Sequence, residues 1–245
     1  MRNTAVRRAA ALLPVLAVLA ARPAAAQFGT NLIVNGGAEA GAGSGTGATV
    51  VPVPGWTTTA PFTVVQYAAG GGFPGAASPG PADRGANFFA GGPGSQSSVA
   101  TQRLDLGSFG GLLPEVAAGN VRFTLAGFFG GFSAQDDAAS LTARFLDAGR
   151  AVVGPVFAAA RDGVTGLLAR SIEGTLPMGA QNVEFTLAMA HREGSYNDAY
   201  ADDLSFVLAS SPATTVPEPG TWALVGTGLA AVLGAARRRG ARSVG

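Results

Sequence analysis

The chain contains no cysteine and no lysine, and its 245 residues include one histidine, His191. Without cysteine, neither disulfide bridges nor thiol catalysis is available. Without lysine, a phosphate-binding Gly-x-x-x-x-Gly-Lys loop and a Schiff-base lysine are excluded. A single histidine excludes zinc sites built from several histidines. A Ser-His-Asp triad would depend on His191, and the chain has no Gly-x-Ser-x-Gly motif to present the serine.

Positive charge is scarce in the middle of the chain. Residues 27–216 carry eight arginines against 14 aspartates and glutamates, a net charge of 8 − 14 = −6, although the whole chain is at +1. The other eight arginines lie near the two ends. An acidic middle segment without a basic patch argues against nucleic acid as a partner.

Residues 1–26 have the order of a secretory signal peptide. Three arginines near the start precede an apolar stretch, and Ala24 and Ala26 supply the small residues that signal peptidase requires. We therefore expect signal peptidase to cleave before Gln27. The alternative, a membrane anchor, is disfavoured because the apolar stretch is short and ends in a cleavage pattern.

Near the C-terminus, a Pro-Glu-Pro tripeptide precedes an uncharged apolar run and an arginine cluster. These are Pro217, Glu218 and Pro219, then residues 222–236, then Arg237, Arg238 and Arg239. Basic residues after an apolar run predict a single hydrophobic helix whose C-terminus stays in the cytoplasm. Its 15 residues (236 − 221) would rise about 22 Å, short of a hydrocarbon core of about 30 Å. The run therefore suits a signal that is removed at least as well as an anchor that stays.

Residues 217–240 resemble the PEP-CTERM sorting signal of Gram-negative bacteria. The resemblance implies that an exosortase recognises the chain and that the C-terminal helix holds it in the membrane until processing. It also implies export across the inner membrane to the cell envelope, the cell surface or the extracellular matrix. Exosortases commonly accompany exopolysaccharide systems, so the resemblance places the chain near extracellular polysaccharide or biofilm.

Residues 27–209 are predicted to form one all-β domain, followed by a linker of small residues at 210–216. Alternation of apolar and polar residues is clearest at 183–189 and recurs at 121–125 and 141–145. About ten short strands separated by Gly/Pro turns, with no convincing amphipathic helix, predict a β-sandwich of two antiparallel sheets.

The remaining strands are expected from shorter patterns, at residues 32–34, 62–67, 87–90, 97–106, 152–153, 170–176 and 201–208. Asp147-Ala-Gly149 is expected to form a hairpin with Gly149 in the left-handed conformation. Alternation in the last strand predicts that Asp202 lies on the same face as Leu204. It also predicts that Asp203 points to the opposite face from Asp202.

Two motifs stand at opposite ends of this domain, Asn31-Leu-Ile-Val-Asn-Gly-Gly-Ala-Glu39 and Asn197-Asp-Ala-Tyr-Ala-Asp-Asp-Leu-Ser-Phe206. They resemble the opening and closing strands of jelly-roll sandwiches in the galactose-binding-like superfamily, which includes many carbohydrate-binding modules. The resemblance implies a jelly-roll domain whose two ends lie side by side and whose partner is a polysaccharide. Ala38 departs from the pattern, because the superfamily usually has an aromatic residue there.

Many members of that superfamily bind a structural Ca²⁺ ion through an opening acidic residue and a closing aspartate. Matched residue by residue, the resemblance assigns Glu39 and Asp202 as ligands, with backbone carbonyls completing a shell of oxygens. Such an ion would tie the first strand to the last. The alternative hypothesis is that Glu39 caps a turn and that Asp202 pairs with an arginine.

Carbohydrate sites in such modules use exposed aromatic faces beside hydrogen-bonding side chains. The candidates are Trp56, Tyr67, Phe73, Tyr196 and Tyr200, of which Trp56 is expected to prefer the core. A second platform, with core packing again preferred, is Phe128, Phe129 and Phe132.

Two other functions remain open. One is a purely structural envelope or biofilm protein without a specific glycan. The other is a glycoside hydrolase, which needs two carboxyl groups converging across a cleft. The acidic pairs Asp136-Asp137 and Asp202-Asp203 are adjacent in sequence, and His191 is expected to be solvated. We therefore expect a non-catalytic domain.

Overall fold

The computed structural model describes residues 28–147, 150–158 and 163–211. The expected signal peptide, the sorting signal at 217–240 and nearly all of the linker lie outside the described residues. So does Gly149, and with it the hairpin conformation expected there. Within the described part of the chain, no helix is long and apolar enough to cross a membrane.

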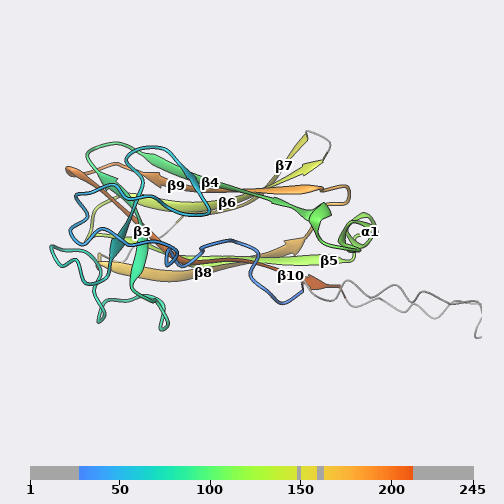
Figure 1. Ribbon diagram of the computed structural model, residues 1–245, viewed down its shortest axis with the longest axis horizontal. Helices are drawn as coiled ribbons and strands as arrows, with labels where there is room; N and C mark the ends of the chain where they lie inside the picture. The colour runs from blue at the N-terminus through green and yellow to red at the C-terminus, as the bar shows by residue number, and fades with distance from the viewer. Residues whose placement is uncertain (1–27, 148–149, 159–162, 212–245) are drawn as a thin grey trace, which may run out of the picture.

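The described residues form two five-stranded antiparallel sheets that stack as two layers (Figure 1). The first sheet has the order β1-β4-β9-β6-β7 and the second the order β2-β3-β10-β5-β8. The strands are β1 Thr57–Thr58, β2 Thr63–Gln66, β3 Asn87–Pro93, β4 Ser98–Asp105, β5 Val121–Gly131, β6 Ala138–Asp147, β7 Arg150–Ala158, β8 Gly166–Thr175, β9 Asn182–Ala190 and β10 Tyr196–Ser210. The predicted all-β jelly-roll sandwich is confirmed.

The core between the sheets follows from the alternation in the sequence. In β9, every second residue from Val183 to Met189 is buried, and the residues between them are partly exposed. Phe185 of β9 meets Phe206 of β10 across the layers, with ring centroids 5.1 Å apart. Burying an aromatic or aliphatic side chain of this size stabilises the fold by about 1.5–3 kcal/mol.

Two expectations about secondary structure were wrong. Residues 32–34 form no strand, and Val34 is 61% exposed. A short helix, α1 Leu112–Ala117, lies between the 3₁₀ turn η1 Leu106–Ser108 and β5, and buries Leu112 and Val116. Six residues are too few for a helical period to be recognised in the sequence.

The opening segment nevertheless lies beside the closing strand, as the resemblance predicts. Asn31 donates from Nδ2 to the carbonyl oxygen of Leu204 over 2.9 Å, and its Oδ1 accepts the backbone N–H of Phe206 over 3.0 Å. Leu204 in turn donates its backbone N–H to the carbonyl of Gly36 over 2.9 Å. A Cβ atom at Gly36 would collide with the carbonyl oxygen of Leu204, so this close approach requires glycine.

A β-bulge in β10 changes which side chains share a face. The register with β5 shifts between Asp202 and Ser205, and Asp203 adopts a positive φ of 45°. Leu204 packs in the core between the sheets, whereas Asp202 hydrogen-bonds Tyr67 outside that core. The expected shared face of Asp202 and Leu204 is therefore wrong, because an extra residue reverses the alternation.

A second apolar cluster covers the opposite face of the second sheet. Along β3, Phe89 belongs to the core between the sheets, and its neighbours Phe88 and Ala90 belong to the second cluster. The cluster also includes Val65, Tyr67, Leu167 and Tyr200, with Phe73, Phe128 and Phe132 packed against it. The connection between β2 and β3, residues 67–86, contributes Tyr67 and Phe73 to this cluster, and Figure 1 draws it in teal.

Candidate functional site

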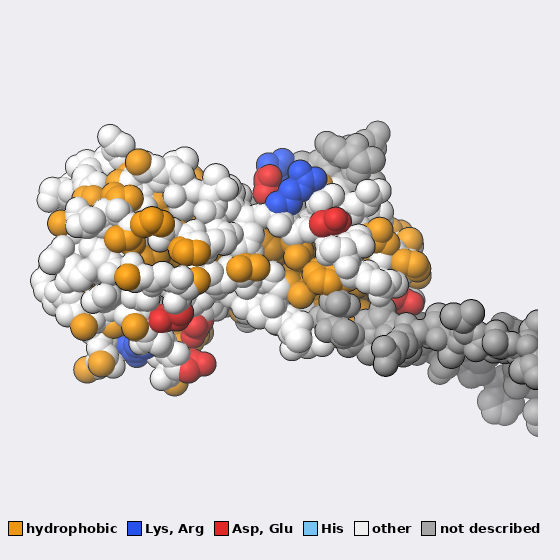
Figure 2. Space-filling view, viewed as in Figure 1, with side chains coloured by type: hydrophobic (Ala, Val, Ile, Leu, Met, Phe, Trp, Pro, Cys, Tyr) orange, Lys and Arg blue, Asp and Glu red, His pale blue; other side chains and the backbone are white. Residues whose placement is uncertain are grey.

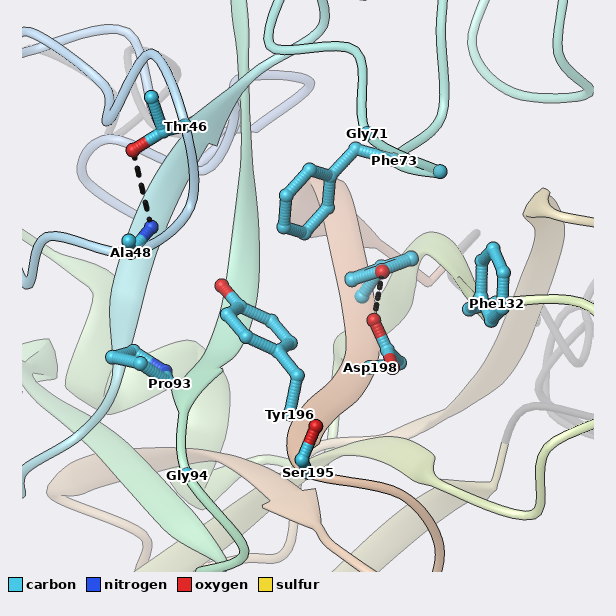
Figure 3. Close-up of a pocket in the computed structure, with 12 residues that line it drawn as sticks. Thr46, Ala48, Gly71, Phe73, Pro93, Gly94, Phe132, Ser195, Tyr196 and Asp198 are labelled. Carbon is cyan, nitrogen blue, oxygen red and sulfur yellow. Dashed lines mark hydrogen bonds between the residues drawn. The ribbon is translucent and has the colours of Figure 1, made fainter.

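A pocket of about 330 Å³ opens between the connection that joins β2 to β3 and the start of β10 (Figure 3). Ligand pockets in proteins occupy about 300–1,000 Å³, so its size suits a small molecule or one end of a chain. It is lined by Thr46, Ala48, Gly71, Gly72, Phe73, Pro93, Gly94, Phe132, Ser195, Tyr196, Asp198 and Tyr200.

The fold gathers these residues from distant parts of the chain. Phe73 comes from the connection between β2 and β3, and Phe132 directly follows β5. Tyr196, Asp198 and Tyr200 are alternate residues of β10. Because alternate residues of a strand point to the same face, the start of β10 supplies two phenols and a carboxylate to one site.

Aromatic rings line opposite sides of the pocket. Phe73 meets the edge of Tyr196 with ring centroids 5.3 Å apart and lies 6.0 Å from the ring of Tyr200. In Figure 3, Phe73 and Tyr196 stand on one side and Phe132 on the other, with Asp198 between them. Phe73, Phe132 and Tyr196 are all half-buried, so parts of their rings remain accessible.

The polar groups of the pocket are concentrated on β10. The hydroxyl of Tyr200 donates a hydrogen bond to Oδ1 of Asp198. Burial, assisted by the charge of Asp198, raises the pKa of both Tyr196 and Tyr200 above its ordinary value. Both phenols therefore stay neutral at physiological pH. Among the described residues, the buried hydroxyl of Tyr196 has no hydrogen-bond partner.

Asp137 fixes the loop that leads into β10. Its Oδ1 accepts backbone N–H groups from Arg192 and Glu193 over 2.6 and 3.0 Å, and its Oδ2 accepts that of Asp198 over 2.7 Å. The Asp137 side chain is fully buried, and Nδ1 of His191 lies 3.4 Å from its Oδ1. His191 is therefore not solvated as expected, because its side chain is 11% exposed and packed beside this carboxylate.

The structure also brings the two expected calcium ligands together. Glu39 and Asp202 are close enough for the charge of Glu39 to raise the pKa of Asp202. Asp202 is fully buried and accepts a hydrogen bond from the Tyr67 hydroxyl over 2.7 Å. Burial raises its pKa to about 8, and the hydrogen bonds from Tyr67 and the Asp203 backbone oppose that shift.

Two further carboxylates join this acidic cluster, Asp83 and Asp203. Burial raises the pKa of Asp203, and so do its hydrogen bond with Asp83 and the charge of Glu39. The expectation that Asp202 and Asp203 point to opposite faces is wrong, because the bulge leaves both near Glu39. Figure 2 shows acidic side chains gathered at the lower left beside a basic one, and a second group of basic and acidic side chains at the top of the same face.

The chemistry of this cluster suits a hard cation. Calcium is bound by carboxylate and carbonyl oxygens, and the cluster offers oxygen donors. Glu39 already accepts the backbone N–H groups of Ala86 and Asn87 on Oε1, over 3.0 and 2.8 Å, so one of its oxygens also holds the start of β3. Among the described residues, no three acidic, histidine or cysteine side chains form a metal-binding group. Backbone carbonyls would have to supply the remaining ligands.

The other aromatic candidates serve the fold. Trp56 is buried in the core, as the sequence predicts, and its ring centroid lies 5.9 Å from that of Phe89. Tyr67 is buried on the opposite face, hydrogen-bonded to Asp202 and covered by the Arg84 guanidinium 5.1 Å from its ring centroid. Sequence reasoning missed Asp198, although its alternation with Tyr196 and Tyr200 was a signal that could have found it.

Several solved structures are similar to this chain. A Stig cyclase, Fisc from Fischerella sp. TAU, in complex with (3Z)-3-(1-methyl-2-pyrrolidinylidene)-3H-indole, is 15% identical over 74% of this chain and 98% of that chain, with a TM-score of 0.52. This likeness shows a shared fold alone. A family 16 carbohydrate-binding module is 20% identical over 72% of this chain and 99% of that chain, with a TM-score of 0.47.

The enzymatically active domain of tailspike protein 4 from bacteriophage CBA120 is 16% identical over 73% of this chain, with a TM-score of 0.45. The match spans 21% of the tailspike chain. No curated protein sequence matches this chain significantly. Residues 215–239, however, match the PEP-CTERM protein-sorting motif, which implies processing by an exosortase and export to the cell envelope or surface of a bacterium.

Proposed function

We propose that this chain is a surface or extracellular-matrix protein of a Gram-negative bacterium whose β-sandwich binds extracellular polysaccharide without cleaving it. Signal peptidase and an exosortase are its partners during export, and the C-terminal helix holds it in the membrane until processing. The observation that carries the proposal is the aromatic pocket at the start of β10. The sorting motif supports it by directing the domain to the compartment where such polymers lie.

The pocket combines the two features that sugar recognition uses. Phe73, Phe132 and Tyr196 offer half-buried ring surfaces on which the C–H face of a sugar ring can pack. The Asp198 carboxylate, which also accepts the Tyr200 hydroxyl, offers oxygen atoms that can accept hydrogen bonds from sugar hydroxyls. The pocket therefore supplies both packing and orientation.

The same geometry supports binding rather than hydrolysis. Glycosidases place two carboxyl groups across the scissile bond, at about 5–10 Å from each other. Among the described residues that line the pocket, Asp198 is the one with a carboxyl group. Asp137, which accepts the backbone N–H of Asp198, is fully buried and already accepts three backbone N–H groups in all.

The acidic cluster of Glu39, Asp83, Asp202 and Asp203 holds a structural Ca²⁺ ion in this proposal, with Glu39 and Asp202 as side-chain ligands. A cation would offset the cost of burying the ionised Asp202 carboxylate, which is considerable because its pKa is raised to about 8. It would also join the opening segment at Glu39 to β10 at Asp202. The ion thus acts on stability and not on chemistry.

A glycan array with the full chain in mild detergent, run with and without chelator, tests this function. We expect polysaccharide hits that Phe73→Ala abolishes and Phe109→Ala retains, because Phe109 packs against the core outside the pocket. The absence of any hit would favour a purely structural protein. Release of shortened oligosaccharides would favour a hydrolase.

A further inference from the structure

The outer side of α1 is mostly apolar although it faces solvent. Leu112 and Val116 fill the inner side of the helix, toward the core. The exposed residues of the helix and its C-cap are Leu113, Pro114, Glu115, Ala117 and Ala118. A helix that is apolar on every side is normally covered on every side, so this outer side indicates a contact with another apolar body.

Met178 extends this apolar surface. It lies in the turn between β8 and β9 and is 71% exposed. It is adjacent to the end of α1, because a Cβ atom at Gly119 would lie 3.8 Å from its Cγ. Figure 2 shows hydrophobic side chains gathered at the end of the molecule where Figure 1 draws α1. We call the exposed Leu113, Pro114, Ala117, Ala118 and Met178 together the α1 surface.

The two segments that form the α1 surface are nearly free of charge. Residues 106–119 and 176–181 contain one charged residue, Glu115. Its carboxylate accepts a hydrogen bond from Nδ2 of Asn120 over 3.1 Å, so it is directed along the turn that follows the helix. An apolar medium can therefore cover the α1 surface with little cost of removing charges from water.

The chain leaves the domain at this same end. Ser210, the last residue of β10, pairs with Val121, and Ser211 donates its backbone N–H to the carbonyl oxygen of Asn120 over 2.6 Å. Ten residues (221 − 211) separate Ser211 from the apolar run at 222–236. Ten residues span at most about 35 Å even when fully extended. While the C-terminal helix is held in a membrane, the domain is therefore tethered to the lipid by the end that carries the α1 surface.

Such a tether makes a small apolar surface sufficient for docking. A short linker turns docking into an intramolecular step, with an effective concentration of the order of millimolar. The bilayer stays within reach of the α1 surface at every protein concentration, whereas the approach of a second copy depends on how many chains are present. The position of the tether therefore favours lipid as the body that covers this surface.

We propose that the α1 surface rests on the lipid bilayer in which the C-terminal helix is held, and so sets the orientation of the sandwich on the membrane. This inference rests on the proposed function, because that function includes the membrane-held state. The pocket begins the same strand, β10, that ends at Ser210, about 45 Å away at about 3.3 Å per residue. Lipid contact at α1 thus directs the pocket away from the membrane, toward extracellular polymer.

Fluorescence quenching in vesicles tests this orientation. The chain has no cysteine, so one introduced cysteine can carry an environment-sensitive dye. Ala117→Cys places the dye on the α1 surface, and Gln96→Cys places it before β4, at the opposite end of that strand from α1. With the full chain in phosphatidylcholine vesicles, we expect brominated lipid to quench the dye at residue 117 at least about threefold more than at residue 96, since interfacial segments enter the bilayer by about 5–10 Å.

Charge placed on the α1 surface should remove this difference. Leu113→Asp combined with Met178→Asp should reduce quenching at residue 117 to the level at residue 96. Met178→Asp alone, at the more exposed of the two positions, should reduce the excess by about half and leave the melting temperature nearly unchanged. Val164→Asp is the matched control, because Val164 is 54% exposed and precedes the far end of β8, and it should leave the quenching as it is.

The outcomes separate this inference from the proposed function. Equal quenching at residues 117 and 96, in chains that float with the vesicles, would overturn the inference and leave polysaccharide binding in place. Quenching that disappears when the chain is diluted to one copy per vesicle would assign the α1 surface to a second copy instead, and shielding that requires added exosortase would assign it to the enzyme. Chains that do not float with the vesicles would contradict the membrane-held state itself, while the glycan array still decides polysaccharide binding.

Discussion

The hydroxyl of Tyr67 donates a 2.7 Å hydrogen bond to Oδ2 of Asp202, which lies 135 residues further along the chain. The bond joins the residue after β2 to the bulge of β10, on the face of the second sheet that points away from the core. Both side chains are buried, so this one contact links the pocket-bearing face to the acidic cluster. The burial of the Asp202 carboxylate at this contact governs how the protein should respond to pH and to calcium.

Stability without a cation should fall as the pH rises through neutrality. Burial raises the pKa of Asp202 from 3.8 to about 8, so the folded chain keeps a proton that the unfolded chain releases. The contribution of Asp202 to the free energy of unfolding is therefore largest below about pH 4. This contribution is lost as the pH rises to about 8, at no more than about 1.4 kcal/mol per pH unit. Urea denaturation with chelator at a series of pH values measures it.

Asp202→Asn is the matched control for that experiment. The amide has nearly the same shape and can still accept from Tyr67, but it does not titrate. The slope of stability against pH should be reduced in the variant. A wild-type slope that persists unchanged in Asp202→Asn would show that another group carries the titration.

Calcium should reverse this pH dependence. A bound cation favours the ionised carboxylate, so binding releases a proton from Asp202 and the affinity should rise between about pH 6 and pH 8. We expect millimolar Ca²⁺ to raise the melting temperature, and Glu39→Gln and Asp202→Asn to remove most of that gain. Glu184→Gln, on the other sheet, should retain it. An identical melting temperature with calcium and with chelator at pH 8 would contradict the calcium proposal.

Much of the fold could be predicted because its strands alternate. Val183, Phe185, Leu187 and Met189 face the core as their spacing requires, and the motif around Asn31 correctly placed the opening segment beside β10. The bulge at Asp203 could not be predicted in this way. A one-residue insertion has no periodic signature, yet it decides which carboxylates meet.

The pocket was predictable only in its parts. The sequence identified Phe73, Tyr196 and Tyr200 as candidates and Phe132 as part of a separate platform, but these rings meet in one pocket only through the packing of loops on the second sheet. Loop packing depends on contacts between residues far apart in sequence, which composition does not report. Trp56 illustrates the converse, because an aromatic residue after a Pro-Gly turn can equally belong to the core.

Arg84→Lys should loosen the loop that covers the second cluster. The guanidinium donates to the carbonyls of Pro81, Gly75 and Ser78 over 2.9, 2.9 and 3.0 Å while covering the ring of Tyr67. A lysine has one nitrogen and cannot reproduce this planar set of donors. We expect a loss of about 1–3 kcal/mol and faster proteolysis within residues 68–86.

Arg122→Lys is the control for that loop. Its ion pair with Glu173 is 3.6 Å long and exposed, so it should contribute less than about 1 kcal/mol. Both substitutions keep the positive charge, so equal effects would contradict the role assigned to the planar guanidinium of Arg84 in the loop.

Asp137→Asn should weaken ligand binding although Asp137 does not line the pocket. Its two carboxylate oxygens accept three backbone N–H groups, from Arg192, Glu193 and Asp198, whereas asparagine offers one oxygen and turns N–H donors toward the others. Leaving buried donors unpaired costs about 1–3 kcal/mol, and the loop that carries Tyr196 and Asp198 should lose its fixed position.

The neighbouring residue provides the comparison, since Asp136 is exposed and Asp136→Asn removes the same charge. That variant should change stability by less than about 0.5 kcal/mol and leave binding intact. Hydrogen exchange of residues 192–198 measures the loop directly and should accelerate in Asp137→Asn alone. If both variants weaken binding equally, the pocket responds to the negative charge of this end of the molecule and not to the hydrogen bonds that Asp137 makes.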